Sequence, residues 1–155
     1  MEVERIDHIH FKTNNMERDT RLFEGLLGRK FPFKIDVSTL YGLRSAFHPF
    51  PLGFNLVEVT GKSNEMAQMY AEAPEGIFAI SLKVPDLEKA TAEMESIGYK
   101  LLFREDNGPV KEALFDTKKA FTLYIELVES PGGSVMDLLE EASARFDSFS
   151  VEKTC

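Results

Sequence analysis

The sequence has a single cysteine, Cys155, which is the last of its 155 residues. One thiol excludes an intramolecular disulfide and a zinc cluster built from cysteines. No hydrophobic run approaches the ~20 residues that a membrane-spanning helix needs. The N-terminus, MEVERIDHIHF, lacks the basic and then apolar layout of a secretion signal. We therefore expect a cytoplasmic protein that does not act in a membrane.

Positive charge is also scarce, because 18 Lys and Arg residues face 26 Asp and Glu residues, for a net charge of −8. There is no basic stripe interleaved with aromatic residues, which argues against nucleic acid and anionic membranes as partners. A glycine-rich phosphate loop is absent as well. The length and the 43% hydrophobic content suit one globular domain over residues 1–155. We expect a small molecule as the partner.

The chain contains an internal repeat. Residues 8–24 align without a gap on residues 79–95, so the offset from 8 to 79 is 71 residues. Each copy predicts a strand followed by a capped helix, and Gly28 and Gly98 stand where a helix-ending glycine belongs. Three further strand-like segments follow in each half. The predicted units are module one at about 4–62, a linker helix at about 63–75, module two at about 76–130 and a C-terminal tail helix at 134–155.

Two of the three histidines lie on the same face of the first predicted strand, because His8 and His10 are two residues apart. We assign Glu58 of the fourth strand and Glu126 of the last strand to the equivalent face. If both modules turn this face inward, the four groups converge across a cavity. Buried carboxylates need a partner, and a divalent metal supplies one. The alternative is that the glutamates face water and the histidines are structural.

Five segments carry a resemblance to a known family. They are IDHIHF with NNMERDTRLFEGLLG, then FNLVEV, GIFAISLKVPDLEKATAEMESIGYKL and FTLYIELVE. This pattern resembles the vicinal oxygen chelate superfamily, and within it the glyoxalase I and methylmalonyl-CoA epimerase branches. The resemblance implies an α+β fold in which two βαβββ modules form an incomplete barrel around a central cavity. It also implies a divalent metal, among Zn, Ni, Co, Mn and Fe, and a possible homodimer.

By position, the resemblance places the metal ligands at His8, Glu58, Ala79 and Glu126. The third position is usually a histidine, so Ala79 departs from the pattern and removes one ligand. His10 lies roughly 6.6–6.8 Å along the strand from His8, on the same face. It could replace the missing ligand, contact the substrate or simply pack in the cavity.

Two further residues are candidates for contact with a metal or a substrate. His48 precedes a proline and is expected in a loop at the mouth of the cavity. Arg44 could hold an anionic group of the substrate, and so could Lys12. In the epimerase branch, a carboxylate on the third strand of the first module serves as a catalytic base. This sequence has Arg44 near that position, so strict epimerase chemistry is not indicated.

The first functional hypothesis is a metal-dependent lyase or isomerase that acts on a carbonyl substrate through an enediolate. Glu126 or Glu58 would be the catalytic base. The alternative is a non-catalytic small-molecule-binding protein of the bleomycin-resistance type, with a degenerate metal site, because Ala79 cannot bind a metal. A scaffold or regulatory subunit is a third possibility. The fold alone does not choose among them.

Overall fold

The computed structural model describes residues 1–36, 38–48, 53–61, 64–135 and 137–139. Eight strands form one sheet in the order β2-β3-β4-β1-β5-β8-β7-β6. In chain order the elements are β1 (Arg5–Thr13), α1 (Met16–Leu27), β2 (Phe33–Asp36), α2 (Ser38–Tyr41), β3 (Leu43–His48), β4 (Gly53–Val59), α3 (Glu65–Glu72), β5 (Gly76–Lys83), α4 (Leu87–Ser96), β6 (Lys100–Asn107), β7 (Val110–Asp116), α5 (Lys118–Phe121) and β8 (Tyr124–Glu129).

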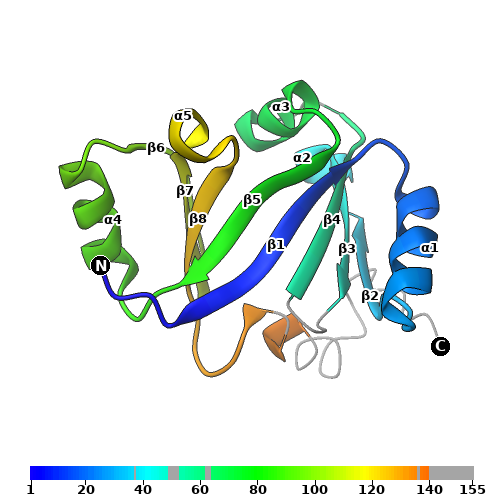
Figure 1. Ribbon diagram of the computed structural model, residues 1–155, viewed down its shortest axis with the longest axis horizontal. Helices are drawn as coiled ribbons and strands as arrows, with labels where there is room; N and C mark the ends of the chain where they lie inside the picture. Colours follow the sequence, from blue (N-terminus) through cyan, green and yellow to red (C-terminus); the bar gives the residue numbers. More distant parts are fainter. Residues whose placement is uncertain (37, 49–52, 62–63, 136, 140–155) are drawn as a thin grey trace.

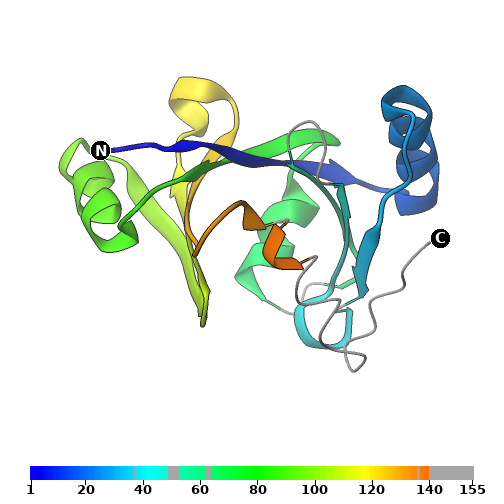
Figure 2. The same cartoon turned by 90° about the horizontal axis from the view of Figure 1, so that it is seen from below.

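The sheet joins two copies of the same arrangement. In each copy the first strand pairs in parallel with the fourth, β1 with β4 and β5 with β8. The copies meet where β1 and β5 pair antiparallel, at the centre of the sheet (Figure 1). The α+β fold of two βαβββ modules is therefore confirmed. The two arms of the sheet curve to the same side and leave an incomplete barrel (Figure 2).

Local sequence signals fix where the two long helices begin. The Asn15 side chain accepts a hydrogen bond from the backbone N–H of Arg18, and Asp86 accepts one from Lys89 in the second copy. Both are N-cap interactions, which satisfy backbone donors that the helix leaves free. Gly28 ends α1 in the left-handed conformation at φ 68°.

Three apolar clusters hold the sheet and helices together. Helices α1 and α4 pack outside the curve and α3 lies inside it (Figure 2). The cluster under α1 contains Met16, Phe31, Ala46 and Leu56. The cluster under α4 contains Val84, Leu87, Ala90, Met94, Ala113, Phe115 and Leu127. The inner cluster joins α3 to the concave face through Leu43, Val57, Ala67, Tyr70, Ala73, Phe78, Ala79, Leu114 and Tyr124. The concave face is thus partly apolar core.

The end of the described chain is tied back to the sheet. Lys83 Nζ donates to the carbonyl oxygens of Gly132 and Gly133, and the backbone N–H of Val135 donates to the Asp7 carboxylate. The predicted tail helix lies mostly outside the described residues, and so does Cys155. Within the part of the chain that the structure describes, no helix is long and apolar enough to span a membrane.

Candidate metal centre

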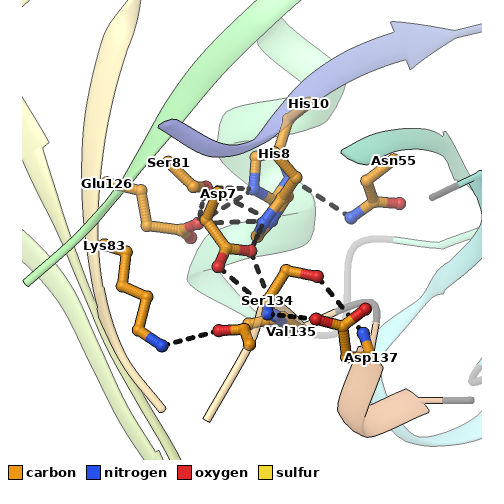
Figure 3. A network of polar contacts seen from close by, with 11 residues as sticks. Asp7, His8, His10, Asn55, Ser81, Lys83, Glu126, Ser134, Val135 and Asp137 are labelled. Carbon is orange, nitrogen blue, oxygen red and sulfur yellow. Dashed lines mark hydrogen bonds and ion pairs between the residues drawn. The ribbon is translucent and has the colours of Figure 1, made fainter. Parts of the chain in front are cut away.

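Three buried ligand-type side chains converge at the centre of the concave face (Figure 3). His8 and His10 come from β1, and Glu126 comes from β8. The strand register brings them together, because His8 pairs with Ser81 of β5 and Ser81 pairs with Glu126. His8, His10 and Glu126 are 2%, 8% and 4% exposed. Buried imidazole and carboxylate groups at one point require either mutual hydrogen bonds or a cation.

The ligand atoms of these residues lie within 4.8 Å of one another. His10 Nε2 is 2.9 Å from Glu126 Oε2, and His8 Nε2 is 3.7 Å from the same oxygen. The Ser81 hydroxyl lies among them, 3.2 Å from His8 Nε2 and 3.0 Å from His10 Nε2, and it donates to Glu126. Both imidazoles therefore turn their Nε2 atoms toward the Glu126 carboxylate.

A second layer of polar groups orients both rings. His8 Nδ1 donates to Asp7 Oδ1 at 2.8 Å, which leaves Nε2 free to bind a metal. His10 Nδ1 lies 2.9 Å from the Tyr70 hydroxyl and 3.3 Å from the amide nitrogen of Asn55. The acceptor Asp7 thus fixes the tautomer of His8, and the contacts of Tyr70 and Asn55 fix the direction of the His10 ring.

The charge states suit metal binding. Burial and the neighbouring His10 lower the pKa of His8, so this imidazole is neutral at pH 7. Burial opposes the charge of Glu126, but His10, His8 and Ser81 outweigh it and lower the pKa of this carboxyl to about 2. Neutral imidazole and ionised carboxylate are the forms that bind divalent metals.

The residues present fit a divalent metal. Two histidines and one carboxylate with open positions form the ligand set found in many mononuclear sites, iron(II) sites among them. The same nitrogen and oxygen donors suit zinc. Asn55 borders the same site, and its buried Oδ1 atom has no hydrogen-bond partner. This oxygen is a further atom that could bind a metal. An unsatisfied buried oxygen at this position fits a ligand or a bound small molecule.

A cavity of about 320 Å³ opens beside the centre. Its wall includes His10, Asn55 and Glu126 from the centre and Glu105 and Glu112 from the opposite arm of the sheet. Apolar and aromatic side chains form much of the remainder: Ile35, Tyr41, Leu43, Phe47, Val57, Met66, Tyr70, Phe78, Phe103 and Leu114. A mostly apolar pocket with a few convergent polar groups is the usual form of a small-molecule site.

The structure does not bring Glu58 to this centre. Glu58 pairs with Thr13 at the far end of β1, five positions along β4 from Gly53, the partner of His8. Its carboxylate accepts from Arg44, which also pairs with Glu17 of α1. Glu58 therefore lies on the helix-covered face, and the expectation that it faces the cavity is corrected.

Asn55 is the residue that sequence reasoning missed. His10 pairs with Asn55 on β4, just as Ser81 pairs with Glu126 on β8. Both pairs obey the 71-residue offset, from 10 to 81 and from 55 to 126. The first-module counterpart of Glu126 is therefore Asn55 and not Glu58. Extending the offset to the fourth strand would have identified it.

The other predicted residues occupy different places. Arg44 is engaged on the outer face with Glu58, so the expected contact with a substrate anion is not supported. His48 is the last residue of β3 and not part of a loop; it is 1% exposed and packs edge-on against Phe31 at 5.2 Å. Lys12 Nζ donates to the carbonyl oxygen of Ala73 at 2.6 Å. His10 lies in the centre itself.

Ala79 faces the same centre. It is the register partner of His10 across β1 and β5, it is 1% exposed and it lines the cavity. The imidazole of His10 therefore lies beside the position at which the resemblance places the third ligand.

Replacing Asp7 with alanine tests the second layer. The Asp7 carboxylate accepts from His8 Nδ1 and from the Val135 N–H, and Asp7 is 3% exposed. We expect Asp7→Ala to weaken zinc binding by about 10–100-fold. It should also lower the free energy of unfolding by about 1–3 kcal/mol, because a buried donor loses its acceptor. Zinc titration and urea denaturation measure the two effects.

Asp116 provides the matched control. It is exposed at the end of β7, so Asp116→Asn should leave both quantities unchanged. If Asp7→Ala also leaves zinc affinity unchanged, the hydrogen bond from His8 to Asp7 has no role in orienting a ligand.

Comparisons with known proteins support the fold. No family model matches the chain, and no curated protein matches it. Among solved structures, it is similar to methylmalonyl-CoA epimerase from Mycobacterium tuberculosis, at 20% identity over 84% of this chain and 90% of that chain, with a TM-score of 0.67. A hypothetical protein from Bacillus halodurans C-125 is similar at 19% identity over 84% of this chain and 96% of that chain, with a TM-score of 0.69.

A third similar structure is a variant of methylmalonyl-CoA epimerase from Streptomyces coelicolor in complex with 2-nitronate-propionyl-CoA. It is 18% identical over 84% of this chain and 100% of that chain, with a TM-score of 0.62. At these identities the likeness concerns the fold. It agrees with the vicinal oxygen chelate architecture that the sequence pattern indicated.

Proposed function

We propose that the protein is a divalent-metal-dependent isomerase or lyase that moves a proton next to the carbonyl group of a small molecule. The observation that carries this proposal is the convergence of His8, His10 and Glu126 beside a cavity of about 320 Å³, which His10 and Glu126 line. The shared fold of several methylmalonyl-CoA epimerases supports the choice of reaction class.

Each residue of the centre has a role in this proposal. His8, His10 and Glu126 would hold the metal, which supplies Lewis acidity that stabilises negative charge on a carbonyl oxygen. Asp7 keeps His8 in the required tautomer, and Tyr70 holds His10. Glu126 borders the cavity in which the substrate would lie and is ionised at neutral pH. Because its pKa is about 2, it would become an effective proton acceptor only when its contacts with His10, His8 and Ser81 are released.

One observation favours a second candidate function. The Ser81 hydroxyl lies within hydrogen-bond distance of His8, His10 and Glu126, so the three groups satisfy one another without a metal. Ala79, at the position of the usual third ligand, also has no side-chain atom that can bind a metal. A non-catalytic small-molecule-binding protein would have these features.

Proton exchange separates the two candidates. The full chain, loaded in turn with Zn, Co, Ni, Mn or Fe(II), would be incubated in D₂O with a panel of small ketones, hydroxyketones and thioesters. An isomerase or lyase of this kind should exchange the α-proton of at least one compound, which proton NMR detects as a loss of signal. Absence of exchange above the buffer rate, with metal bound, contradicts the enzymatic proposal and leaves the binding protein.

A further inference from the structure

The wall of the cavity carries three acidic side chains, and His10 is the one basic side chain among its described residues. Glu105, Glu112 and Glu126 line it, and among the described residues of the wall there is no lysine or arginine. Because apolar side chains border the cavity, water screens the interaction between these acidic groups and a charged ligand only weakly. An anionic ligand would therefore meet these carboxyl groups with no lysine or arginine of the wall to offset them.

Nearby cations are paired elsewhere. Lys111 and Arg104 lie on β7 and β6, next in sequence to Glu112 and Glu105, and their side chains point to the opposite face of the sheet. Lys111 pairs with Glu129 at 2.8 Å, and Arg104 pairs with Glu88. Neither is available to neutralise the cavity.

Glu105 and Glu112 are directly opposite each other in the β6–β7 register. Like charges in this position destabilise a sheet unless something separates or neutralises them. No described residue forms a hydrogen bond or an ion pair with either carboxylate. Burial, then the charges of Glu126 and Glu105, raise the pKa of Glu112 well above its usual range. The carboxyl therefore favours its neutral form in the empty cavity, and a cation bound beside it would favour the ionised form. The pair thus lacks the cation that would stabilise it.

The rest of the wall offers electron-rich groups. Five aromatic rings line the cavity: Tyr41, Phe47, Tyr70, Phe78 and Phe103. The face of such a ring attracts an organic cation. Asn55 lines the same cavity, is 6% exposed, and has an Oδ1 atom without a hydrogen-bond partner. An unpaired acceptor of this kind is satisfied by a ligand that donates a hydrogen bond or carries positive charge.

We infer that the cavity takes an organic cation, an ammonium compound whose charged nitrogen lies against Glu105, Glu112 and the aromatic rings. The further statement that this cation carries a carbonyl group, which would face His10 and Glu126, rests on the proposed function. The Streptomyces epimerase structure holds an acyl-CoA ligand; the wall of this cavity selects a different class of substrate.

A set of three probes with the same phenacyl core tests the inference by isothermal titration calorimetry. The cation is phenacyltrimethylammonium. Its neutral counterpart is 3,3-dimethyl-1-phenylbutan-1-one, in which a tert-butyl group replaces the trimethylammonium group, and the anion is 3-benzoylpropionate. We expect the cation to bind at least about tenfold more tightly than the neutral ketone, and the anion to bind more weakly than either. Equal affinities, or preference for the anion, would overturn the inference.

Variants of the cavity glutamates test which residues cause the preference for the cation. Glu112→Gln should remove most of the preference for the cation and leave the affinity for the neutral ketone unchanged, with Glu105→Gln acting in the same direction. Glu88→Gln is the matched control, because Glu88 is an exposed glutamate that pairs with Arg104 outside the cavity. If the preference persists in both cavity variants, or falls equally in the control, these carboxylates do not hold the cation.

The titration is carried out on EDTA-treated and on zinc-loaded protein, so that its failure differs from failure of the proposed function. If the protein prefers the cation but catalyses no proton exchange, we conclude that it is a binding protein for organic cations and that the proposed enzymatic function is wrong. If the protein catalyses proton exchange on neutral or anionic carbonyl compounds and shows no preference for the cation, the proposed enzymatic function stands and the inference about the substrate is overturned.

Discussion

Replacing Glu126 with glutamine is expected to weaken binding of divalent metal more than about 100-fold, since loss of an outer-layer partner alone costs about 10–100-fold. It should also abolish proton exchange. Glu126 is the only carboxylate in the described group of converging ligand atoms, and its pKa of about 2 keeps it ionised. Glutamine keeps the size of the side chain but loses the charge. Metal titration and the exchange assay measure the two losses.

Glu58→Gln is the matched control for this variant. Glu58 is also a strand glutamate, but its carboxylate lies against Arg44 on the outer face. We expect wild-type metal affinity and exchange from Glu58→Gln. Wild-type metal affinity in Glu126→Gln, or equal losses in the two variants, would contradict the assignment of the centre to β1 and β8. Circular dichroism during heating verifies that both variants fold.

Replacing His10 with alanine is expected to have the second largest effect. His10 Nε2 lies 2.9 Å from Glu126 Oε2 and takes the place that Ala79 leaves without a donor. With His10→Ala, only one imidazole and one carboxylate remain in the centre. We expect loss of stoichiometric zinc binding at micromolar metal concentrations, measured by equilibrium dialysis.

A compensating change makes this prediction specific. Ala79 is the cross-strand partner of His10 and lines the cavity, so a histidine at position 79 has space to reach the centre. The double variant His10→Ala with Ala79→His should regain stoichiometric zinc binding at saturating metal. Undiminished binding in His10→Ala alone would show that His10 is only a packed residue of the cavity.

The fold and two of the three converging ligands, His8 and Glu126, could be predicted from the sequence, with His10 as a candidate for the missing ligand. The repeat at an offset of 71 residues and the capped helices gave the βαβββ order, because both signals are local. His8, His10 and Glu126 stood out because polar residues at alternating positions of an otherwise apolar strand need an explanation. That the two modules form one incomplete barrel came from the family resemblance, and their joining through β1 and β5 is a finding of the structure.

The error at Glu58 has a physical cause. Asn55, Leu56 and Val57 are all buried, since β4 contacts the α1 cluster on one face and the inner cluster on the other. A strand buried on both faces has no alternation of apolar and polar residues to reveal its orientation. A slip of one residue then exchanges the two faces.

One further feature depends on the curvature of the sheet, and the error at His48 has a different cause. Glu105 and Glu112 lie on the outer arm of module two, and they meet the cavity only because that arm curves toward α3 (Figure 2). Nothing in the segment VKEALFD indicates this curvature. His48 was expected in a loop because a proline follows it, yet the residue before a proline also favours extended backbone, and it ends β3.

The metal content of the protein tests the central claim most directly. The chain would be purified without a polyhistidine tag or chelator, incubated with Zn, Co, Ni, Mn and Fe(II), dialysed and measured by elemental analysis beside His8→Ala. We predict close to one ion per chain in the wild-type protein and none in the variant. No retained metal in the wild-type protein, with any of the five ions, would contradict the metal centre and leave the cavity as a site for binding alone.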